Sequence, residues 1–293
     1  TTRRLLFGGG REPRVEAVEV VLDSNVTWKL PARRVVLAAG ALGTPGLLLA
    51  SGAGARCNAT VGGDLQDHVG FRTLFSLRAS CDDRSLGGEG SWTRSLMQAK
   101  GANINLVAYL GEKWPYAQVI LEPLCGGVGE ETRLAFNVVV VLLRGASRGR
   151  VRQAAVHAPR SGGGDPQPKV DFEIAEEDMD MLVRTFLFVR TQVFGSPLLA
   201  AYPAEPHPLG QFPPVDDHAG LYRHIAGRLQ NFYHMAGTAH RALDRRLRLR
   251  GCRGVVVADA SAFAVPVVGH PDVPARALGR VAARYLLEDE GVL

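Results

Sequence analysis

The chain has 293 residues, of which 46% are hydrophobic and 22% charged, so it can fill one large domain or two ordinary ones and is not expected to be disordered. No run approaches the ~20 consecutive apolar residues of a membrane-spanning helix. The net charge of +5 rests partly on arginines near the C-terminus, but in Leu247–Gly251 these alternate with leucines, as on the solvent side of a half-buried strand. Because interleaved aromatic residues are absent there, we expect no nucleic-acid partner.

The first seventy residues predict strands followed by a helix. Two β segments lie within Leu5–Leu22, on either side of a turn at Gly8-Gly9-Gly10. The apolar run Arg33–Gly40 ends in small residues, as a buried parallel strand does where a helix follows. A helix over Pro45–Ser51 fits that position, and Gly52 is expected to end it.

The middle of the chain predicts a different architecture. Short β-prone runs separated by glycine-rich loops indicate a mainly antiparallel sheet. These runs are Asn105–Tyr109, Gln118–Leu121, Leu134–Leu143, Arg150–Val156 and Lys169–Ile174. A helix with acids in its first turn and an apolar stripe then runs from Glu176 to Val193, and a second helix is predicted at His218–Leu229.

The last part of the chain returns to the first pattern. Val255–Asp259 predicts another buried strand, and Asp272 is expected to cap a closing helix. The simplest layout is an α/β (α+β) protein in which both chain ends build one domain and a sheet domain interrupts it.

The four cysteines, Cys57, Cys81, Cys125 and Cys252, lie far apart in the sequence. They form no CxxC pair, and no histidine stands at metal-ligand spacing from them. We therefore expect no metal site and interpret the cysteines as buried free thiols.

Several segments carry motifs whose order and spacing are informative. They are Gly40–Gly54 (GALGTPGLLLASGAG), Val61–His68 (VGGDLQDH), Tyr233–Thr238 (YHMAGT), Val257–Ser261 (VADAS) and Gly269-His270-Pro271. Together they resemble the signatures of the glucose-methanol-choline (GMC) oxidoreductases, which are flavoenzymes that oxidise alcohols. Three places depart from the family pattern: Ala53 stands where the family prefers a larger aliphatic residue, Asp64 replaces the usual Asn, and Ala239-His240-Arg241 replaces a Cys, a variable residue and Met-Gly.

The resemblance implies an FAD-binding Rossmann-like domain and a substrate domain with an antiparallel sheet. A strand that ends in Asp259-Ala260-Ser261 presents small side chains and backbone N–H groups to which phosphate oxygens can come close. By resemblance, the cofactor-binding residues are Ala39, Gly40, Ala41, Asp259, Ala260 and Pro271. An alternative stays open for Asp259, whose carboxylate could instead cap the following turn.

The resemblance also implies the catalytic groups and a small-molecule alcohol as substrate. Oxidation of an alcohol removes the hydroxyl proton as a hydride leaves the carbon, and histidine is the side chain that titrates near neutrality. The family pattern assigns the base to His234 and a second hydrogen-bonding group to His270. Lower priority goes to His240, Asp67 and His68, the last with a structural role near the flavin edge.

The dinucleotide-binding GxGxxG segment of the family is not found in this sequence, because Gly8-Gly9-Gly10 lacks its spacing and is followed by Arg11-Glu12-Pro13. We therefore expect an incomplete FAD-binding domain in an N-terminally truncated chain. The expected division is a partial FAD-binding domain over 1–70, a substrate-binding domain over 71–230 and a return to the FAD-binding domain over 231–293.

Two alternative functions remain open at this stage. Some plant members of the family are hydroxynitrile lyases that hold FAD without using it for redox chemistry, and His270-Pro271 with Leu278-Gly279-Arg280 resembles their ending. The chain could also be a non-catalytic remnant or binding module. Neither compartment nor oligomeric state follows from a recognisable pattern, and Thr1–Gly10 matches no targeting signal.

Overall fold

The structure is a computed structural model that describes residues 1–22, 26–80, 106–113, 115–128, 131–153, 168–197, 200, 204–206 and 212–292. The chain forms two compact units. Unit 1 consists of Thr1–Asp67, Ser147–Glu173 and Tyr233–Leu293, and unit 2 of His68–Ala146 and Ile174–Phe232. The strands Arg148–Arg152 and Lys169–Glu173, which the sequence assigned to the middle domain, belong to unit 1, where Gly149 pairs through its backbone with Leu65.

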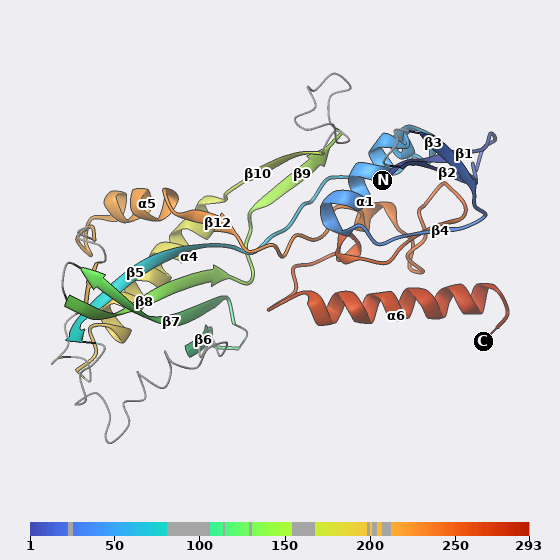
Figure 1. Ribbon diagram of the computed structural model, residues 1–293. Coiled ribbons are helices and arrows are strands. Elements are labelled where there is room, and N and C mark those ends of the chain that lie inside the picture. Colours follow the sequence, from blue (N-terminus) through green and yellow to red (C-terminus); the bar gives the residue numbers. More distant parts are fainter. Residues whose placement is uncertain are drawn as a thin grey trace. The chain divides into compact units, whose positions relative to one another are not determined.

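Unit 1 combines a parallel strand pair with a small antiparallel sheet (Figure 1). Strand β4 (Val35–Leu37) pairs in parallel with β13 (Val255–Val257), which confirms the two strands expected from the sequence. Burial is confirmed for β13, whereas in β4 only Leu37 is buried. The antiparallel sheet has the order β1-β2-β3. The other elements are β1 (Thr2–Phe7), β2 (Val15–Val21), β3 (Thr27–Pro31), α1 (Gly40–Ala50), α2 (Ala53–Arg56), β9 (Arg148–Arg152), β10 (Lys169–Glu173), the short helices η4 (His240–Ala242) and η5 (Ala260–Ala262), and α6 (Asp272–Asp289).

Helix α1 begins at Gly40, one and a half turns before the expected start at Pro45. Proline has no N–H and cannot donate to the carbonyl four residues earlier, which is that of Ala41. The hydroxyl of Thr238 donates to this carbonyl at 2.7 Å instead. A residue far along the chain thus satisfies the acceptor that proline leaves open, so the helix can include Pro45.

Two sequence expectations about single residues in unit 1 are wrong. Asp272 does not cap α6: Pro271 is the N-cap, no side chain caps the helix, and the Asp272 carboxylate accepts from Nε of Arg276 at 3.1 Å. Leu247–Gly251 is not a regular strand, because Leu247 has φ +61°, although Leu249 is buried and its arginine neighbours are exposed as expected.

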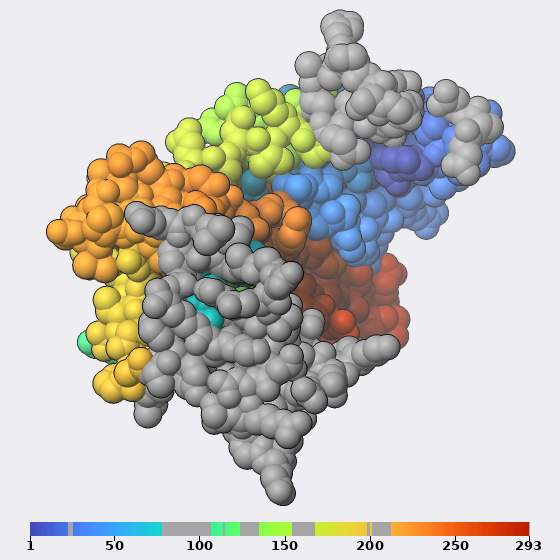
Figure 2. All heavy atoms as spheres, turned by 60° about the vertical axis from the view of Figure 1, so that its left-hand side comes forward, coloured from blue at the N-terminus to red at the C-terminus, as the bar shows by residue number. Residues whose placement is uncertain are grey.

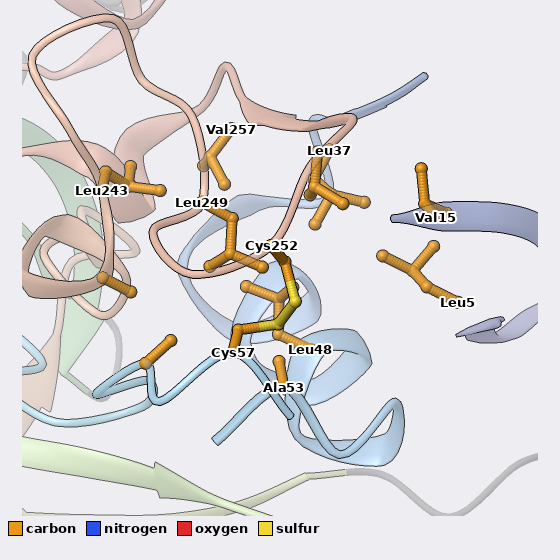
Figure 3. Close-up of a cluster of buried hydrophobic side chains, with 13 residues drawn as sticks. Leu5, Val15, Leu37, Leu48, Ala53, Cys57, Leu243, Leu249, Cys252 and Val257 are labelled. Atoms are coloured by element: carbon orange, nitrogen blue, oxygen red, sulfur yellow. A yellow bond between two sulfur atoms is a disulfide. The ribbon is translucent and has the colours of Figure 1, made fainter. Parts of the chain in front are cut away.

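The interpretation of the cysteines as free thiols is also wrong for two of them. Cys57 and Cys252 form a disulfide across a sequence separation of 195 residues, with their Cα atoms 5.0 Å apart. The bond lies in the core of unit 1 among Leu48, Ala53 and Leu249 (Figure 3). Tertiary folding creates this proximity, because the C-terminal loop before β13 packs against the segment after α2. Cys81 and the side chain of Cys125 lie outside the described residues.

Unit 2 is built on a six-stranded antiparallel sheet with the order β11-β5-β8-β7-β6 and with β12 also paired to β5. The antiparallel architecture predicted from the sequence is confirmed. Its elements are β5 (Val69–Ser80), β6 (Leu106–Leu110), β7 (Ala117–Val128), β8 (Glu131–Leu142), α4 (Glu176–Phe188), the π-helix η2 (Val189–Val193), β11 (Ala204–Pro206), α5 (His218–Ala226) and β12 (Leu229–Asn231). Sequence analysis missed β5, where buried Thr73 and Ser76 interrupt the apolar pattern.

Aromatic rings form the centre of unit 2. Phe186 of α4 contacts Phe71 and Phe75 of β5 edge-on, at centroid distances of 5.6 and 6.2 Å. The predicted apolar stripe of α4 is confirmed, since Met179, Leu182 and Phe186 are buried. Helix α5 packs beside α4, and Figure 2 shows their orange and yellow surfaces next to each other.

Candidate functional site

The turn after β13 is held against the start of α1 by the side chain of Asp259. One carboxylate oxygen accepts from the N–H of Gly40 at 3.0 Å and from the hydroxyl of Thr44 at 2.5 Å. The other oxygen accepts from the N–H of Ser261 at 2.9 Å, which makes Asp259 the N-cap of η5. The capping role that the sequence left open for this residue is therefore present. Because Asp259 is buried, its three hydrogen bonds also join the two ends of unit 1.

The residues expected to bind a cofactor around this turn lie close together. Ala39 donates its N–H to Thr44, Gly40 donates to Asp259, and the carbonyl of Ala41 accepts from Thr238. Gly40 has φ +76°, and a Cβ atom there would meet no heavy atom within 4 Å. The backbone at the start of α1 is therefore open on the side where a side chain would stand.

His234 and His270 come together as an edge-to-face pair, with ring centroids 4.8 Å apart and an angle of 79° between the planes. His234 is half-buried and His270 is exposed. His270 stands on the loop before α6, two residues ahead of the helix, whose N-cap is Pro271. Two imidazoles from separate motifs can therefore both contact one bound molecule.

The backbone around His234 is fixed on both sides. Its N–H donates to the carboxylate of Asp67 at 2.9 Å. The preceding residue, Tyr233, has φ +59° and a side chain that is 80% exposed. A bulky residue in the left-handed region is uncommon and costs about 1–3 kcal/mol, and such outliers gather at functional sites. This conformation turns the tyrosine outward and gives the chain the direction that brings His234 to His270.

The segment after His234 connects the histidine pair to the turn at Asp259. Ala236 and Gln66 exchange backbone hydrogen bonds of 2.9 and 3.0 Å. Gly237 then donates to the carbonyl of Ala260, and Ala239 to that of Ser261. Gly237 has φ +90°, and a Cβ atom there would stand 2.7 Å from the backbone oxygen of Asp64. Only glycine fits this close crossing, which explains the glycine of the YHMAGT motif.

Two of the departures from the GMC pattern, Asp64 and Arg241, contact each other. Asp64, with φ +62°, accepts hydrogen bonds from Nε and Nη2 of Arg241 at 3.1 and 2.9 Å. The same carboxylate lies 3.5 Å from Nε2 of His240 and 3.6 Å from Nε of Arg148. An acid in place of an amide is thus matched by a nearby cation in place of an apolar residue.

Some of the residues that build this site were not singled out from the sequence. Thr44 and Thr238 hold the start of α1, and Asp67, which had low priority, holds the backbone of His234. All three lie inside recognised motifs, so position in a motif was the available signal. His68 belongs to unit 2 and is buried. Within the part of the chain that the structure describes, no group of three or more potential metal ligands occurs.

Fold and site define the class of the protein: a split α/β unit carrying a histidine pair, with an antiparallel-sheet unit inserted in its sequence. Two family models described as GMC oxidoreductase match the chain, one over residues 1–70 and the other over residues 146–279. The chain belongs to the GMC oxidoreductase family.

Individual relatives agree with this assignment. The GMC-type oxidoreductase acuG of Aspergillus aculeatus is 25% identical over 94% of this chain and 60% of its own length. Among solved structures, a formate oxidase of Aspergillus oryzae matches with a TM-score of 0.76 at 18% identity, over 100% of this chain and 60% of that one. Pyridoxine 4-oxidase from Mesorbium loti matches with a TM-score of 0.70 at 22% identity, over 97% and 56%. The chain therefore spans about 60% of the length of the relatives it matches, and the structural likeness establishes the fold.

Proposed function

We propose that this chain carries the substrate-side groups of an FAD-dependent oxidoreductase that acts on the CH–OH group of a small alcohol. The observation that supports it is the histidine pair, because alcohol oxidation needs a proton acceptor next to a group that stabilises the substrate oxygen. Proteins of similar structure also support this proposal. One is the formate oxidase, which was studied for the modification of its FAD, and another is a fungal aryl-alcohol oxidase.

The residues around the turn at Asp259 fit a bound cofactor in two respects. The backbone of Gly40 is open to a ligand, and it lies beside the turn. Two buried polar atoms in the motifs, Oε1 of Gln66 and Oγ of Ser261, have no hydrogen-bond partner among the described residues. Buried polar groups without a partner cost about 1–3 kcal/mol, so a bound group would relieve this cost. The residues assigned to hold FAD are Ala39, Gly40, Ala41, Asp259, Ala260 and Pro271.

Each group has a separate role in the proposed reaction, which follows from its chemistry. Bound flavin supplies a hydride acceptor at its N5 atom. An imidazole nitrogen of His234 accepts the hydroxyl proton of the alcohol, while Asp67 keeps the backbone of His234 in place. An imidazole N–H of His270 donates a hydrogen bond to the substrate oxygen as negative charge develops on it.

The test is anaerobic reduction of the flavin in the presence of saturating FAD and a panel of primary and aromatic alcohols. Bleaching of the flavin absorption band by one alcohol is the expected result. His234→Ala should slow this bleaching by ~10²-fold or more, because the general base is lost. His218→Gln is a matched control, since His218 is an exposed histidine on α5 of unit 2.

An unchanged bleaching rate in the His234→Ala variant would remove this residue from the mechanism. Cyanide release from a cyanohydrin without any bleaching would replace the oxidase with the hydroxynitrile lyase alternative. FAD binding without either reaction would leave only a binding role.

A further inference from the structure

Unit 1 contains a concave site whose lining includes neither histidine of the pair. It is a cavity of about 490 Å³ at the amino ends of β4 and β13, and Arg34, Gly254 and Val255 line it. Ligands of parallel α/β sheets bind beyond the carboxyl ends of the strands, where the turn at Asp259 stands. The length of β13 separates the two places by about 10 Å at ~3.3 Å per residue. The cavity is therefore distinct from the proposed cofactor turn.

Two arginines face this cavity from directly opposite backbone positions. Arg14 and Arg253 form a parallel β-bridge, and both line the cavity. Paired residues of such a bridge present their side chains on the same face, about 5 Å apart at the backbone. Like charges placed directly opposite each other destabilise a pair of strands, unless an anion lies between them.

Two of the three acids that line the cavity are engaged by other arginines. Asp244 accepts from Arg248 at 2.8 Å, and Asp289 accepts from Arg246 at 3.0 Å. Burial favours a higher pKa for Asp244, but hydrogen bonds from Arg248 and from the backbone of Arg246 outweigh it and keep that pKa below its ordinary value. Glu12 also lines the cavity. Within the described residues, neither Arg14 nor Arg253 has an ion pair or a side-chain hydrogen bond.

The backbone that presents Arg253 is held on both sides. Its N–H donates to Pro13 and its carbonyl accepts from Val15. The neighbouring Cys252 is tied to Cys57 by the disulfide. On the other side, Gly254 has φ +86°, and a Cβ atom there would stand 2.6 Å from the backbone oxygen of Arg33. A fixed backbone lowers the entropy cost of forming a two-arginine binding site.

We propose that Arg14 and Arg253 form a binding site for a phosphate group carried by a small organic molecule. Guanidinium groups bind phosphate oxygens in a bidentate manner, which suits two arginines side by side. Leu286, which is half-buried, supplies an apolar wall for the organic part of the ligand. The site does not depend on the proposed oxidase activity.

The experiment is calorimetric titration of the 293-residue chain with inorganic phosphate, pyrophosphate and a nucleoside diphosphate at low ionic strength. Saturable binding is expected, tighter for the nucleoside diphosphate than for inorganic phosphate. Arg14→Gln and Arg253→Gln should each raise Kd by about tenfold, because each removes a charge-assisted contact. Arg14→Lys should give a smaller loss, because it keeps the charge but not the bidentate geometry.

The matched control is Arg276→Gln, which removes an exposed arginine of α6 that does not line the cavity. Circular dichroism of each variant verifies its fold, and Arg14→Gln tests the site if Arg253→Gln is unstable. Equal losses in Arg276→Gln and in the cavity variants would overturn the proposal, as would the absence of saturation at 10 mM of any phosphate (about 100-fold above a Kd of 0.1 mM). Tight binding of a DNA duplex or an anionic vesicle, but of none of the small phosphates, would also overturn it.

Discussion

Aromatic rings form the centre of unit 2, whereas in unit 1 covalent and hydrogen-bonded links between distant segments accompany the apolar core. Phe71, Phe75 and Phe186 of unit 2 are each at most 2% exposed. In unit 1, Trp28 of β3 is 53% exposed, Val36 of β4 is 47% exposed, and α6 buries only Ala282. Unit 1 has its own buried core around the disulfide and adds links between distant segments, namely the disulfide and the bonds of Asp259. The comparison teaches that specific links between distant segments add to packing in the unit with the candidate site, whereas aromatic packing forms the centre of the other unit.

The largest effect is expected from damage to the core of unit 2. Phe186→Ala should lower the free energy of unfolding by about 3–5 kcal/mol, because it leaves a cavity among the aromatic rings around it. Phe188→Ala, on the same helix but 43% exposed, should cost much less. Urea denaturation measures both variants, and hydrogen exchange should locate the loss in unit 2. Comparable losses in the two variants would contradict a packing-dominated unit 2.

The matching damage to unit 1 is removal of the disulfide. Cys57→Ser with Cys252→Ser should lower stability by about 2–5 kcal/mol, because the bond closes a loop of almost two hundred residues in the unfolded chain. Faster hydrogen exchange should appear in β4, β13 and α1 and leave β7 and β8 unchanged. Dithiothreitol should reproduce the effect in the unmodified chain and have none on the double variant. An equal acceleration in both units would show that their stabilities are not separate.

A pH effect is expected in unit 2 from one half-buried histidine, His224. The pKa of His224 is lowered to about 4 by burial and by the charges of Arg228 and Arg190, while its ring stacks on Phe186. An unfolded histidine has a pKa near 6.5, so between about pH 6.5 and 4 the unfolded state binds more protons, and stability falls as the pH falls. The loss should reach about 1 kcal/mol after allowance for partial exposure to solvent.

His224→Phe removes this titration and keeps a ring at the same place. Melting curves of the two proteins between pH 7 and 4 give the comparison. Parallel pH profiles would exclude His224 as the source of the difference.

The smallest effect is expected from Asp64 and Arg241 of unit 1, the two departures from the family pattern that form an ion pair. A double-mutant cycle of Asp64→Asn and Arg241→Met should give a coupling energy of about 0.5 kcal/mol, because Arg241 is largely exposed. The coupling should decrease in 1 M salt. Asp272 and Arg276, an exposed pair within α6, are the reference cycle. A coupling no larger than that of the reference would mean that the two departures do not compensate each other.

Much of the fold was accessible from local patterns. The parallel strands at Val35 and Val255, the antiparallel middle sheet and the stripe of α4 follow from hydrophobic periodicity, and the structure confirms them. Patterns of this kind failed where polar residues are buried, as at Thr73 and Ser76 of β5. They also failed at the start of α1, where a distant threonine serves the carbonyl left open by Pro45.

In the candidate site, too, the sequence predicted some features and the structure supplied others. The motifs alone pointed to His234, His270 and Asp259, since residue types and spacing are properties of the sequence. The structure adds why Gly237 stands in its motif, because only glycine tolerates that backbone angle so close to the backbone of Asp64.

Tertiary structure alone decided which residues meet. Three contacts join segments that lie far apart in the chain. They are the disulfide of Cys57 with Cys252, the ion pair of Asp64 with Arg241, and the β-bridge of Arg14 with Arg253. Local propensity depends on a few neighbouring residues, whereas these contacts depend on how β4 and β13 bring the two chain ends together. A disulfide, an ion pair and a like-charge pair therefore arise from the fold and could not be read from spacing.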